Sequence, residues 1–177
     1  MVRPKPIVMT GLLGTGKSSI AESVGQALGV PVFAKVWLEA ALRRAGLAQT
    51  PEQAQVVGYA GYELLSALAE RQLRLGQSAI LDSVASTESI RATWRTLASE
   101  HAASWYVVEC ICSDVALHRE RLRSRKRGIP DWHELEWSEV EHVRGYYALW
   151  QEECLVLDAV YPLATNADRA LRYVQDA

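Results

Sequence analysis

Short apolar runs alternate with longer amphipathic stretches along the whole chain. Most of the runs are near-continuous blocks of aliphatic and aromatic side chains, which is typical of strands buried on both faces of a sheet. Between them, apolar residues recur every three or four positions, as they do in helices that cover a sheet. The predicted strands are residues 6–10, 29–35, 78–83, 104–112 and 154–159, and the predicted helices are residues 17–28, 36–46, 51–75, 87–101, 114–126, 138–151 and 167–175.

Helix start and stop signals agree with this alternation. Gly29 follows the first amphipathic stretch, where a glycine commonly ends a helix. Thr50 and Pro51 open the longest stretch as N-cap and first helical residue. Strands separated by helices favour a parallel sheet with right-handed crossovers, and 177 residues suit a single domain over residues 1–177. The predicted fold class is α/β with three layers, with ligands at the carboxyl ends of the strands.

A glycine-rich loop, "GLLGTGKSS", joins the first predicted strand to the first predicted helix. It matches the pattern G-x-x-x-x-G-K-[ST], whose glycines let backbone N–H groups converge on phosphate oxygens. The lysine of this pattern, Lys17, reaches the β- and γ-phosphates, and the Ser18 hydroxyl is placed to coordinate Mg²⁺. The predicted nucleotide-binding residues of the loop are Gly11, Leu12, Leu13, Gly14, Thr15, Gly16, Lys17, Ser18 and Ser19.

Carboxylates end two of the predicted strands. Asp82 ends the third, where a P-loop protein places the acid that holds Mg²⁺ or its waters, although an acid there also commonly caps the next turn. Asp158 ends the fifth strand and is farther from the loop in sequence. Ser18 and Asp82 are therefore the predicted metal-binding residues, and Asp82 on the acceptor side remains the alternative. The stretch "SVASTES" after Asp82 offers no clear water-positioning residue, which favours transfer over hydrolysis.

Residues 117–128, "LHRERLRSRKRG", are rich in arginine. Arg121 and Arg125 are four apart and share a helix face, where their guanidinium groups could stack on a base and neutralise phosphate charge. The plain alternative is a solvated basic face. A break at residues 128–130 and an acidic stretch follow, so that residues 119–137 have the form of a lid that closes over ATP and excludes water.

With the loop at 11–18, "ILDS" at 80–83 and "RLRSR" at 121–125, the chain resembles small P-loop kinases related to nucleoside monophosphate kinases. More narrowly, it resembles the AAA-type ATPase-like family of predicted kinases, which is similar to polynucleotide kinase 5′-domains, chloramphenicol phosphotransferase and zeta toxins. The resemblance implies a sheet of order 2-3-1-4-5 with a mobile lid, ATP with Mg²⁺, and an acceptor hydroxyl. It also implies that Arg121 flanks adenine and Arg125 meets phosphate. The predicted catalytic residues are Lys17, Asp82 and Arg125.

The chain departs from this family at the end of strand two. Many relatives carry S-D-x-[IL]-R there, and the aspartate acts as a base on the acceptor hydroxyl. Here Val36 stands at the aspartate position and Glu39 at the arginine position. Valine cannot take a proton, so either Asp82 or Glu39 does this work, or acceptor chemistry is impaired. A solvated Glu39 is the plain alternative.

An acceptor pocket is expected between strand two, the helices over residues 36–75 and the lid. Its candidate lining residues are Lys35, Glu39, Tyr59 and Tyr62, with Trp37, Trp132 and His133 as further candidates. Two tyrosines three apart share a helix face, and at this spacing aromatic residues are more often part of the core. A histidine on a lid could act as a general base, but is more often a surface residue.

Charge and composition limit the partners. The net charge is -2, which makes a long nucleic acid an unlikely ligand, although a short oligonucleotide end remains compatible. No apolar run is long enough to span a bilayer, and the first one leads into the glycine loop instead of forming a signal peptide. The expected compartment is the cytoplasm, and no membrane partner is expected. The sequence carries no signal for an oligomeric state.

The sequence therefore predicts an ATP-dependent phosphotransferase that moves the γ-phosphate to a hydroxyl of a small-molecule acceptor, such as a nucleoside, sugar or antibiotic-like compound. ATP is favoured over GTP because no Asn/Thr-Lys-x-Asp stretch is present. One alternative is a non-catalytic or regulatory ATP-binding module, in which Val36 marks a lost base. A further alternative is a polynucleotide-end kinase or a zeta-toxin-like kinase.

Overall fold

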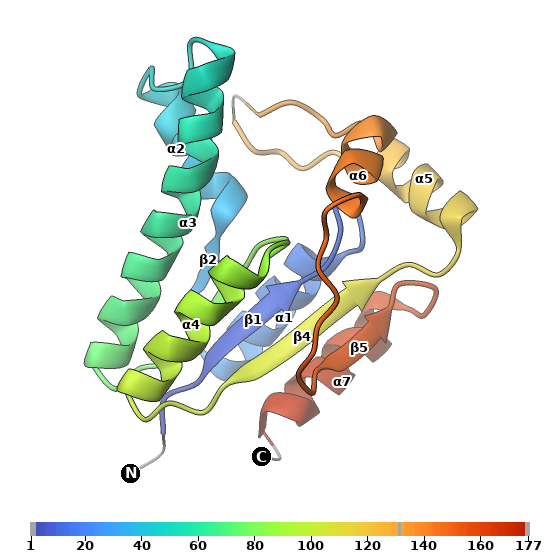
Figure 1. The fold of residues 1–177 in the computed structure, drawn as a ribbon. Coiled ribbons are helices and arrows are strands. Elements are labelled where there is room, and N and C mark those ends of the chain that lie inside the picture. The colour runs from blue at the N-terminus through green and yellow to red at the C-terminus, as the bar shows by residue number, and fades with distance from the viewer. Residues whose placement is uncertain (1–2, 131, 176–177) are drawn as a thin grey trace.

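In the computed structural model, which describes residues 3–130 and 132–175, five parallel strands form one sheet of order β2-β3-β1-β4-β5 (Figure 1). This order confirms the predicted fold class. The strands are β1 (Pro6–Thr10), β2 (Val32–Ala34), β3 (Ala79–Asp82), β4 (Tyr106–Ile111) and β5 (Leu155–Asp158). The helices are α1 (Lys17–Leu28), α2 (Lys35–Arg44), α3 (Pro51–Arg74), α4 (Glu88–Glu100), α5 (Val115–Ser124), α6 (Trp137–Arg144) and α7 (Leu163–Gln175).

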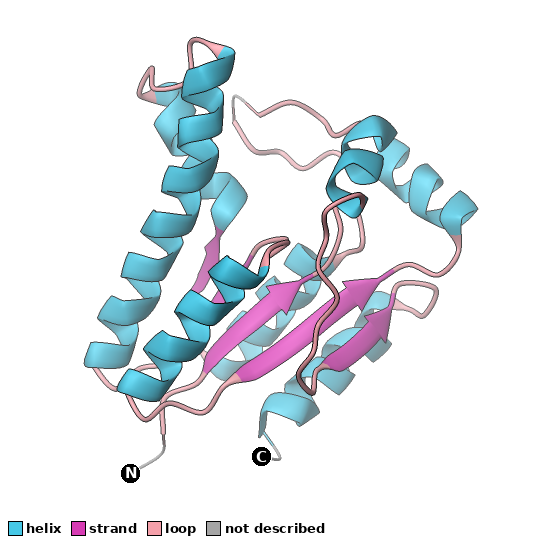
Figure 2. Ribbon diagram, in the orientation of Figure 1, coloured by secondary structure: helices cyan, strands magenta, loops and turns pink. Residues whose placement is uncertain are grey.

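Helices cover both faces of the sheet, which gives three layers (Figure 2). Ile7 and Met9 of β1 pack on one face, in a buried cluster with Val24 of α1 and residues of α7. Val8 points to the other face and packs with Leu65 of α3 and residues of α4. All five residues of β1 are buried, so the continuous apolar run reflects a strand enclosed on both sides.

Strand β2 is shorter than predicted. Residues 29–31 connect α1 to β2 instead of forming strand: Gly29 caps the helix in a left-handed conformation with φ 66°, and Val30 N–H donates to the Gly25 carbonyl at 3.1 Å. Helix α2 then begins at Lys35, immediately after Ala34. The direct junction places the start of α2 beside the end of β3, since Ala34 pairs with Asp82.

The helix predicted over residues 138–151 is wrong in its second half, because α6 ends at Arg144. The following segment bonds to distant partners instead of continuing the helix. The buried guanidinium of Arg91 donates to the carbonyls of Ala148 and Leu149 at 2.7 and 3.1 Å, and Ala148 N–H donates to the Ser86 carbonyl at 2.9 Å. These long-range bonds fix the segment to α4 and to the β3–α4 connection.

Two further helix boundaries differ from the prediction. Helix α5 ends at Ser124, and Arg125 is already extended with ψ 130°. Helix α7 begins at Leu163, directly after Pro162 and four residues earlier than expected. The predicted lid covers the end of α5 and the irregular residues 125–136, of which residue 131 lies outside the described part. Among the described helices, none is both long and apolar enough to cross a membrane.

Candidate active site

The glycine loop lies at the carboxyl end of β1 and leads directly into α1. Gly11, Gly14 and Gly16 have φ angles of 129°, 81° and 85°, a region that side chains other than glycine rarely adopt. At Gly11 space also forbids a side chain, because a Cβ would lie 2.0 Å from the Cys110 carbonyl oxygen. The loop therefore presents its backbone at the N-terminus of α1, where the helix dipole favours an anion.

Helix α5 supports the loop through a histidine that sequence reasoning missed. His118 is buried, and its Nε2 lies 2.7 Å from the Leu13 carbonyl oxygen. Because a carbonyl only accepts, Nε2 carries the proton and donates this bond. Burial lowers the pKa of His118, which favours the neutral imidazole. The only signal in the sequence is a histidine within the arginine-rich helix, and nothing local shows that it reaches the loop.

Lys17, Ser18 and Asp82 form the polar centre of the site. Asp82 is only 3% exposed, and within the described residues its Oδ1 has no hydrogen-bond partner. Burial raises the pKa of Asp82, while the neighbouring Lys17 ammonium and Ser18 hydroxyl favour its charged form. Burial likewise lowers the pKa of Lys17, and Asp82 counteracts this shift. A buried ammonium suits the phosphates of a nucleotide, and a buried carboxylate suits the cation that accompanies them.

The same centre fits Mg²⁺. This cation prefers hard oxygen ligands, and it usually binds through one or two protein groups together with waters and phosphates. The Ser18 hydroxyl and the unpartnered Asp82 Oδ1 are oxygen ligands of this kind. Ser18 and Asp82 are therefore the residues that could hold the ion, in line with the sequence-based hypothesis.

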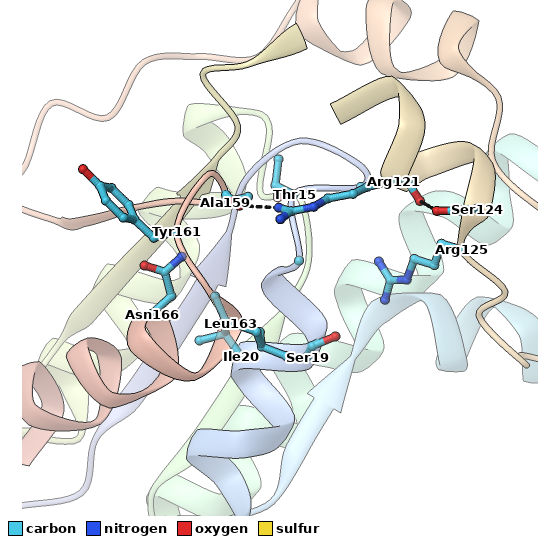
Figure 3. A pocket seen from close by; sticks show the side chains of 12 residues that line it. Thr15, Ser19, Ile20, Arg121, Ser124, Arg125, Ala159, Tyr161, Leu163 and Asn166 are labelled. Atoms are coloured by element: carbon cyan, nitrogen blue, oxygen red, sulfur yellow. Dashed lines mark hydrogen bonds between the residues drawn. The ribbon is translucent and has the colours of Figure 1, made fainter. Parts of the chain in front are cut away.

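A first cavity of ≈ 370 Å³ lies on one side of the loop (Figure 3). Arg121 reaches across from α5 and donates to the Ala159 carbonyl, while Arg125 points toward the start of α1. Both predicted arginines therefore line the same cavity, although Arg125 lies just beyond the helix. The lining residues are Gly14, Thr15, Gly16, Ser19, Ile20, Arg121, Ser124, Arg125, Ala159, Tyr161, Leu163 and Asn166.

The β5–α7 connection and α7 form a wall of this first cavity that the sequence did not predict. Tyr161 and Asn166 lie there, and Figure 3 shows them across the cavity from Arg125. Asn166 is almost fully buried, and its Nδ2 donates to the Asp158 carbonyl at 2.8 Å. Asp158 accepts from the backbone N–H groups of Ser113 and Val160 at 3.1 and 3.2 Å. Asp158 is thus a turn cap and does not face the loop.

A second cavity of ≈ 1070 Å³ lies on the other side of the loop. It is enclosed by α2, α3, the β3–α4 connection, part of residues 127–135 and α6. Its lining includes Leu13, Lys17, Ser18, Asp82 and Val36, together with the four predicted acceptor residues Lys35, Glu39, Tyr59 and Tyr62. The structure thus brings all four to a cavity that also contains the polar centre. Gly11 and Leu12 line neither cavity.

An ion pair dominates the α2 side of the second cavity. Lys35 Nζ lies 2.5 Å from Glu39 Oε1, with side chains 14% and 13% exposed, so the alternative of a solvated Glu39 is wrong. The same ammonium lies 4.4 Å from the centre of the Tyr62 ring. Burial raises the pKa of Tyr62 to about 12. Tyr59 is 67% exposed and lies at the rim.

Arg127 and Trp132 add a second wall. Arg127 is half-buried, and its Nε and Nη2 have no hydrogen-bond partner in the described part of the chain. Its charge acts on both Asp82 and Lys17, so it lies near the polar centre. The centre of the Trp132 ring lies 5.9 Å from the guanidinium carbon of Arg127 and 5.0 Å from that of Arg43 in α2. In the sequence, Arg127 is one of several basic residues in a row, and nothing there distinguishes it from its neighbours.

Two further candidates lie elsewhere. Trp37 is 47% exposed, and His133 contacts Glu139 with its Nε2 2.8 Å from the carboxylate Oε1. Neither residue lines the second cavity, whereas Trp132 does. The geometry therefore offers no support for His133 as a general base at this site.

The family model described as an AAA domain matches residues 7–148, which is most of the chain. The protein therefore belongs to this AAA-domain family. Its fold is that of the P-loop kinases, and the predicted resemblance is confirmed at the level of family and fold. No curated protein matches the chain at a significant level.

Solved structures of kinases are similar over nearly the whole chain. A candidate kinase from Chloroflexus aurantiacus is 21% identical, covers 99% of this chain and 96% of its own, and has a TM-score of 0.77. A gluconokinase from Sinorhizobium meliloti is 21% identical, with 99% and 94% covered and a TM-score of 0.69. The APS kinase from Mycobacterium tuberculosis, solved with AMPPNP and APS, is 18% identical, with 99% of both chains covered and a TM-score of 0.69. At these identities the likeness shows the fold.

Proposed function

We propose that the protein is an ATP-dependent phosphotransferase that moves the γ-phosphate of ATP to a hydroxyl of a small-molecule acceptor. The observation that carries this proposal is the pair of cavities on opposite sides of one glycine loop. The first holds Arg121 and Arg125, and the second, at ≈ 1070 Å³, contains Lys17 and Asp82. Hydrolysis needs room only for a water, whereas transfer needs a site for an acceptor.

The nucleotide occupies the first cavity and the loop. Arg121, held by the Ala159 carbonyl, flanks the adenine from the α5 side. Backbone N–H groups of the loop and the Lys17 ammonium bind the phosphates. Ser18 and Asp82 hold Mg²⁺, which neutralises phosphate charge when it is bound.

Transfer forms a bond between the acceptor oxygen and the γ-phosphorus as the bond to the β–γ bridging oxygen breaks. ADP leaves with the electrons of that bond, and the acceptor proton goes to a cavity carboxylate, Asp82 or Glu39. Arg125 and Arg127 approach the γ-phosphoryl group from the first and second cavities respectively, where they oppose its charge. Because such transition states are loose, positioning and charge matter more than a strong base, so Val36 is compatible with transfer.

The irregular segment around Arg127 and Trp132 acts as the lid in this proposal. Trp132 contacts Arg43 of α2, so this segment reaches across the mouth of the second cavity. A lid in this position excludes water from the γ-phosphate, which suppresses hydrolysis.

The proposal is tested by incubating the protein with Mg-ATP and a panel of nucleosides, sugars and aminoglycoside-type compounds. Mass spectrometry should find ADP and a phosphorylated acceptor in equal amounts, and Lys17→Ala should abolish both. Tight Mg-ATP binding with no phosphorylated acceptor from the whole panel would overturn the proposal.

A nucleotide-binding module without transfer is the second candidate, and Val36 at the place of the family base favours it. It predicts thermal stabilisation by Mg-ATP that Lys17→Ala removes, without release of ADP under any acceptor condition. Release of stoichiometric ADP with one acceptor decides against this candidate.

A further inference from the structure

Helix α3 leaves room for the Lys35–Glu39 pair at one interior glycine. A glycine in a helix interior costs roughly 1 kcal/mol relative to alanine, so its presence calls for a structural reason. At Gly61, a Cβ would lie 2.9 Å from Glu39 Cγ and 3.3 Å from Lys35 Cγ, which are inner atoms of both side chains. At Gly58, a Cβ would lie at an ordinary 3.7 Å from Glu39 Oε1. The pair is therefore seated against α3 at Gly61.

The pair also lies beside the polar centre. Ala34 is the register partner of Asp82, so Lys35 follows directly from the strand position next to Asp82. Both members of the pair line the second cavity together with Asp82. An acceptor that contacts the pair can therefore also approach the γ-phosphate.

The hydrogen-bonding capacity of the pair is only partly used. Within the described part of the chain, Lys35 is the sole hydrogen-bond partner of the Glu39 carboxylate, through Oε1. Oε2 can then accept from a ligand, and the remaining Lys35 N–H groups can donate to one. A hydroxyl group is both donor and acceptor, so adjacent hydroxyls complement the pair.

The net charge of the pair is zero, which limits the acceptor. A ligand carboxylate or phosphate here would lie against Glu39, and a ligand ammonium would lie against Lys35. Either would be desolvated beside a like charge without a free counter-charge. Arg127 does not change this balance, because its charge acts on Asp82 and Lys17, at the phosphate end of the site.

Resting on the proposed function, we infer that Lys35 and Glu39 are the acceptor-recognition residues and that the acceptor is an uncharged polyhydroxy compound of the sugar or cyclitol class. Glu39 accepts from one hydroxyl, Lys35 donates to another, and the exposed ring of Tyr59 lies at the rim of the same cavity. The ion pair thus determines specificity by rejecting ligands of either charge.

The acceptor class is tested with matched sets of compounds and Mg-ATP. Each set contains an uncharged member and a carboxylate or phosphate derivative, and the first set also contains an amine: glucose, glucuronate and glucosamine; ribose and ribose 5-phosphate; inositol and inositol phosphate. We expect phosphorylation of uncharged members, with kcat/KM at least about tenfold above their charged partners. Preference for an anionic or aminated member would overturn this inference while leaving the proposed function intact.

The recognising residues are tested with Glu39→Gln and Gly61→Ala. Glu39→Gln removes the charged hydrogen-bond acceptor, and the Cβ of Gly61→Ala displaces the pair that carries it. Each change should raise the acceptor KM roughly ten- to hundredfold, while the Kd for Mg-ATP stays unchanged. Glu70→Gln is the matched control, because Glu70 forms an exposed i,i+4 pair with Arg74 on α3 with an N–O distance of 2.5 Å. Gly58→Ala, which meets no close contact, should change the acceptor KM less than Gly61→Ala.

Several outcomes separate the two proposals. An acceptor KM unaltered by Glu39→Gln and Gly61→Ala, in variants with wild-type thermal unfolding, would overturn the assignment of the pair. If Mg-ATP binds and no member of any set is phosphorylated, this inference fails, and the proposed function fails with it only if the nucleosides and aminoglycoside-type compounds of the panel also yield no product.

Discussion

The two cavities that flank the glycine loop are built in different ways. The first is lined by backbone and side chains of the glycine loop and the start of α1, by two arginines four apart, and by a wall from the β5–α7 connection and α7. The second combines side chains from α2, α3, the β3–α4 connection and α6, which are distant in sequence. Phosphate binding uses backbone groups and a helix terminus, which a short pattern can encode. Recognition of one particular acceptor uses side chains that only the tertiary fold brings together.

The two cavities also differ in charge. Arg121 and Arg125 enter the first cavity without an acidic residue in its lining. In the second cavity, Lys35 is neutralised by Glu39 at 2.5 Å, and Lys17 and Arg127 lie near Asp82. A polyanion therefore fits one side, whereas the other suits an uncharged ligand whose reacting hydroxyl lies near the cations at the phosphate end of the site.

The largest effect should come from Arg127, the arginine that lines the second cavity near the polar centre. Arg127→Ala should lower kcat by about a hundredfold, because it removes charge stabilisation of the transferring group, while the Kd for Mg-ATP changes little. The measurement is steady-state kinetics beside nucleotide titration. Arg123→Ala is the control, since Arg123 is exposed and lines neither cavity. Equal losses in both variants would refute the special position of Arg127.

A smaller effect should appear in the pH dependence of Mg-ATP binding. Burial raises the pKa of Asp82 above its usual 3.8, and the ion requires the charged carboxylate. Affinity should therefore fall by up to about tenfold per pH unit below the raised pKa, at a higher pH than for an exposed aspartate. Nucleotide titration at stepwise lower pH tests this. In Asp82→Asn, the affinity for Mg-ATP should no longer fall with pH in this range.

The free energy of unfolding of the ligand-free protein should change with pH in the opposite direction to the affinity for Mg-ATP. The folded state binds the Asp82 proton more tightly than the unfolded state does, because burial raises the pKa in the folded state. The contribution of Asp82 to the free energy of unfolding is therefore present at low pH and is lost as pH rises through the unfolded-state and then the raised folded-state pKa. Denaturant unfolding of wild type and Asp82→Asn over the same pH range should reveal this difference. If the wild-type affinity and stability change only at or below the usual aspartate pKa, both pH predictions are wrong.

The smallest effect should come from restoring the family acid. Val36→Asp should change kcat by less than about fivefold, since a loose transition state depends little on a base. Steady-state kinetics with the best acceptor provides the test. A rise of about a hundredfold or more, as general-base catalysis can supply, would show that the second cavity lacks a base it needs.

The sequence predicted the parts of the molecule that local physics determines. The alternation of strands and helices and the glycine loop followed from apolar runs and a short pattern, whereas the strand order came from the family resemblance, and the structure confirms that order. The prediction was wrong where distant bonds override local pattern: Arg91 binds the carbonyls of Ala148 and Leu149, so the helix predicted to residue 151 ends at Arg144.

The candidate site shows the same division. Lys35 and Glu39 lie on adjacent turns of α2, where an i,i+4 spacing brings them together, but the sequence assigned Lys35 to the preceding strand and so did not predict the pair. The contacts of His118 with the loop and of Arg127 with the polar centre depend on how α5 and the following segment cross the sheet. No spacing in the sequence encodes those distances, because they arise between elements separated by about a hundred residues or by a chain reversal.

The attachment of residues 145–150 has a consequence for how this protein can vary. Arg91 and Ser86 clamp the chain on the carboxyl side of α6, whereas the irregular segment on its amino side makes few such bonds in its described residues. Extra residues can therefore be accommodated before α6 but not after it. Loop-insertion libraries, and natural length differences between relatives, should concentrate on that one side of the helix.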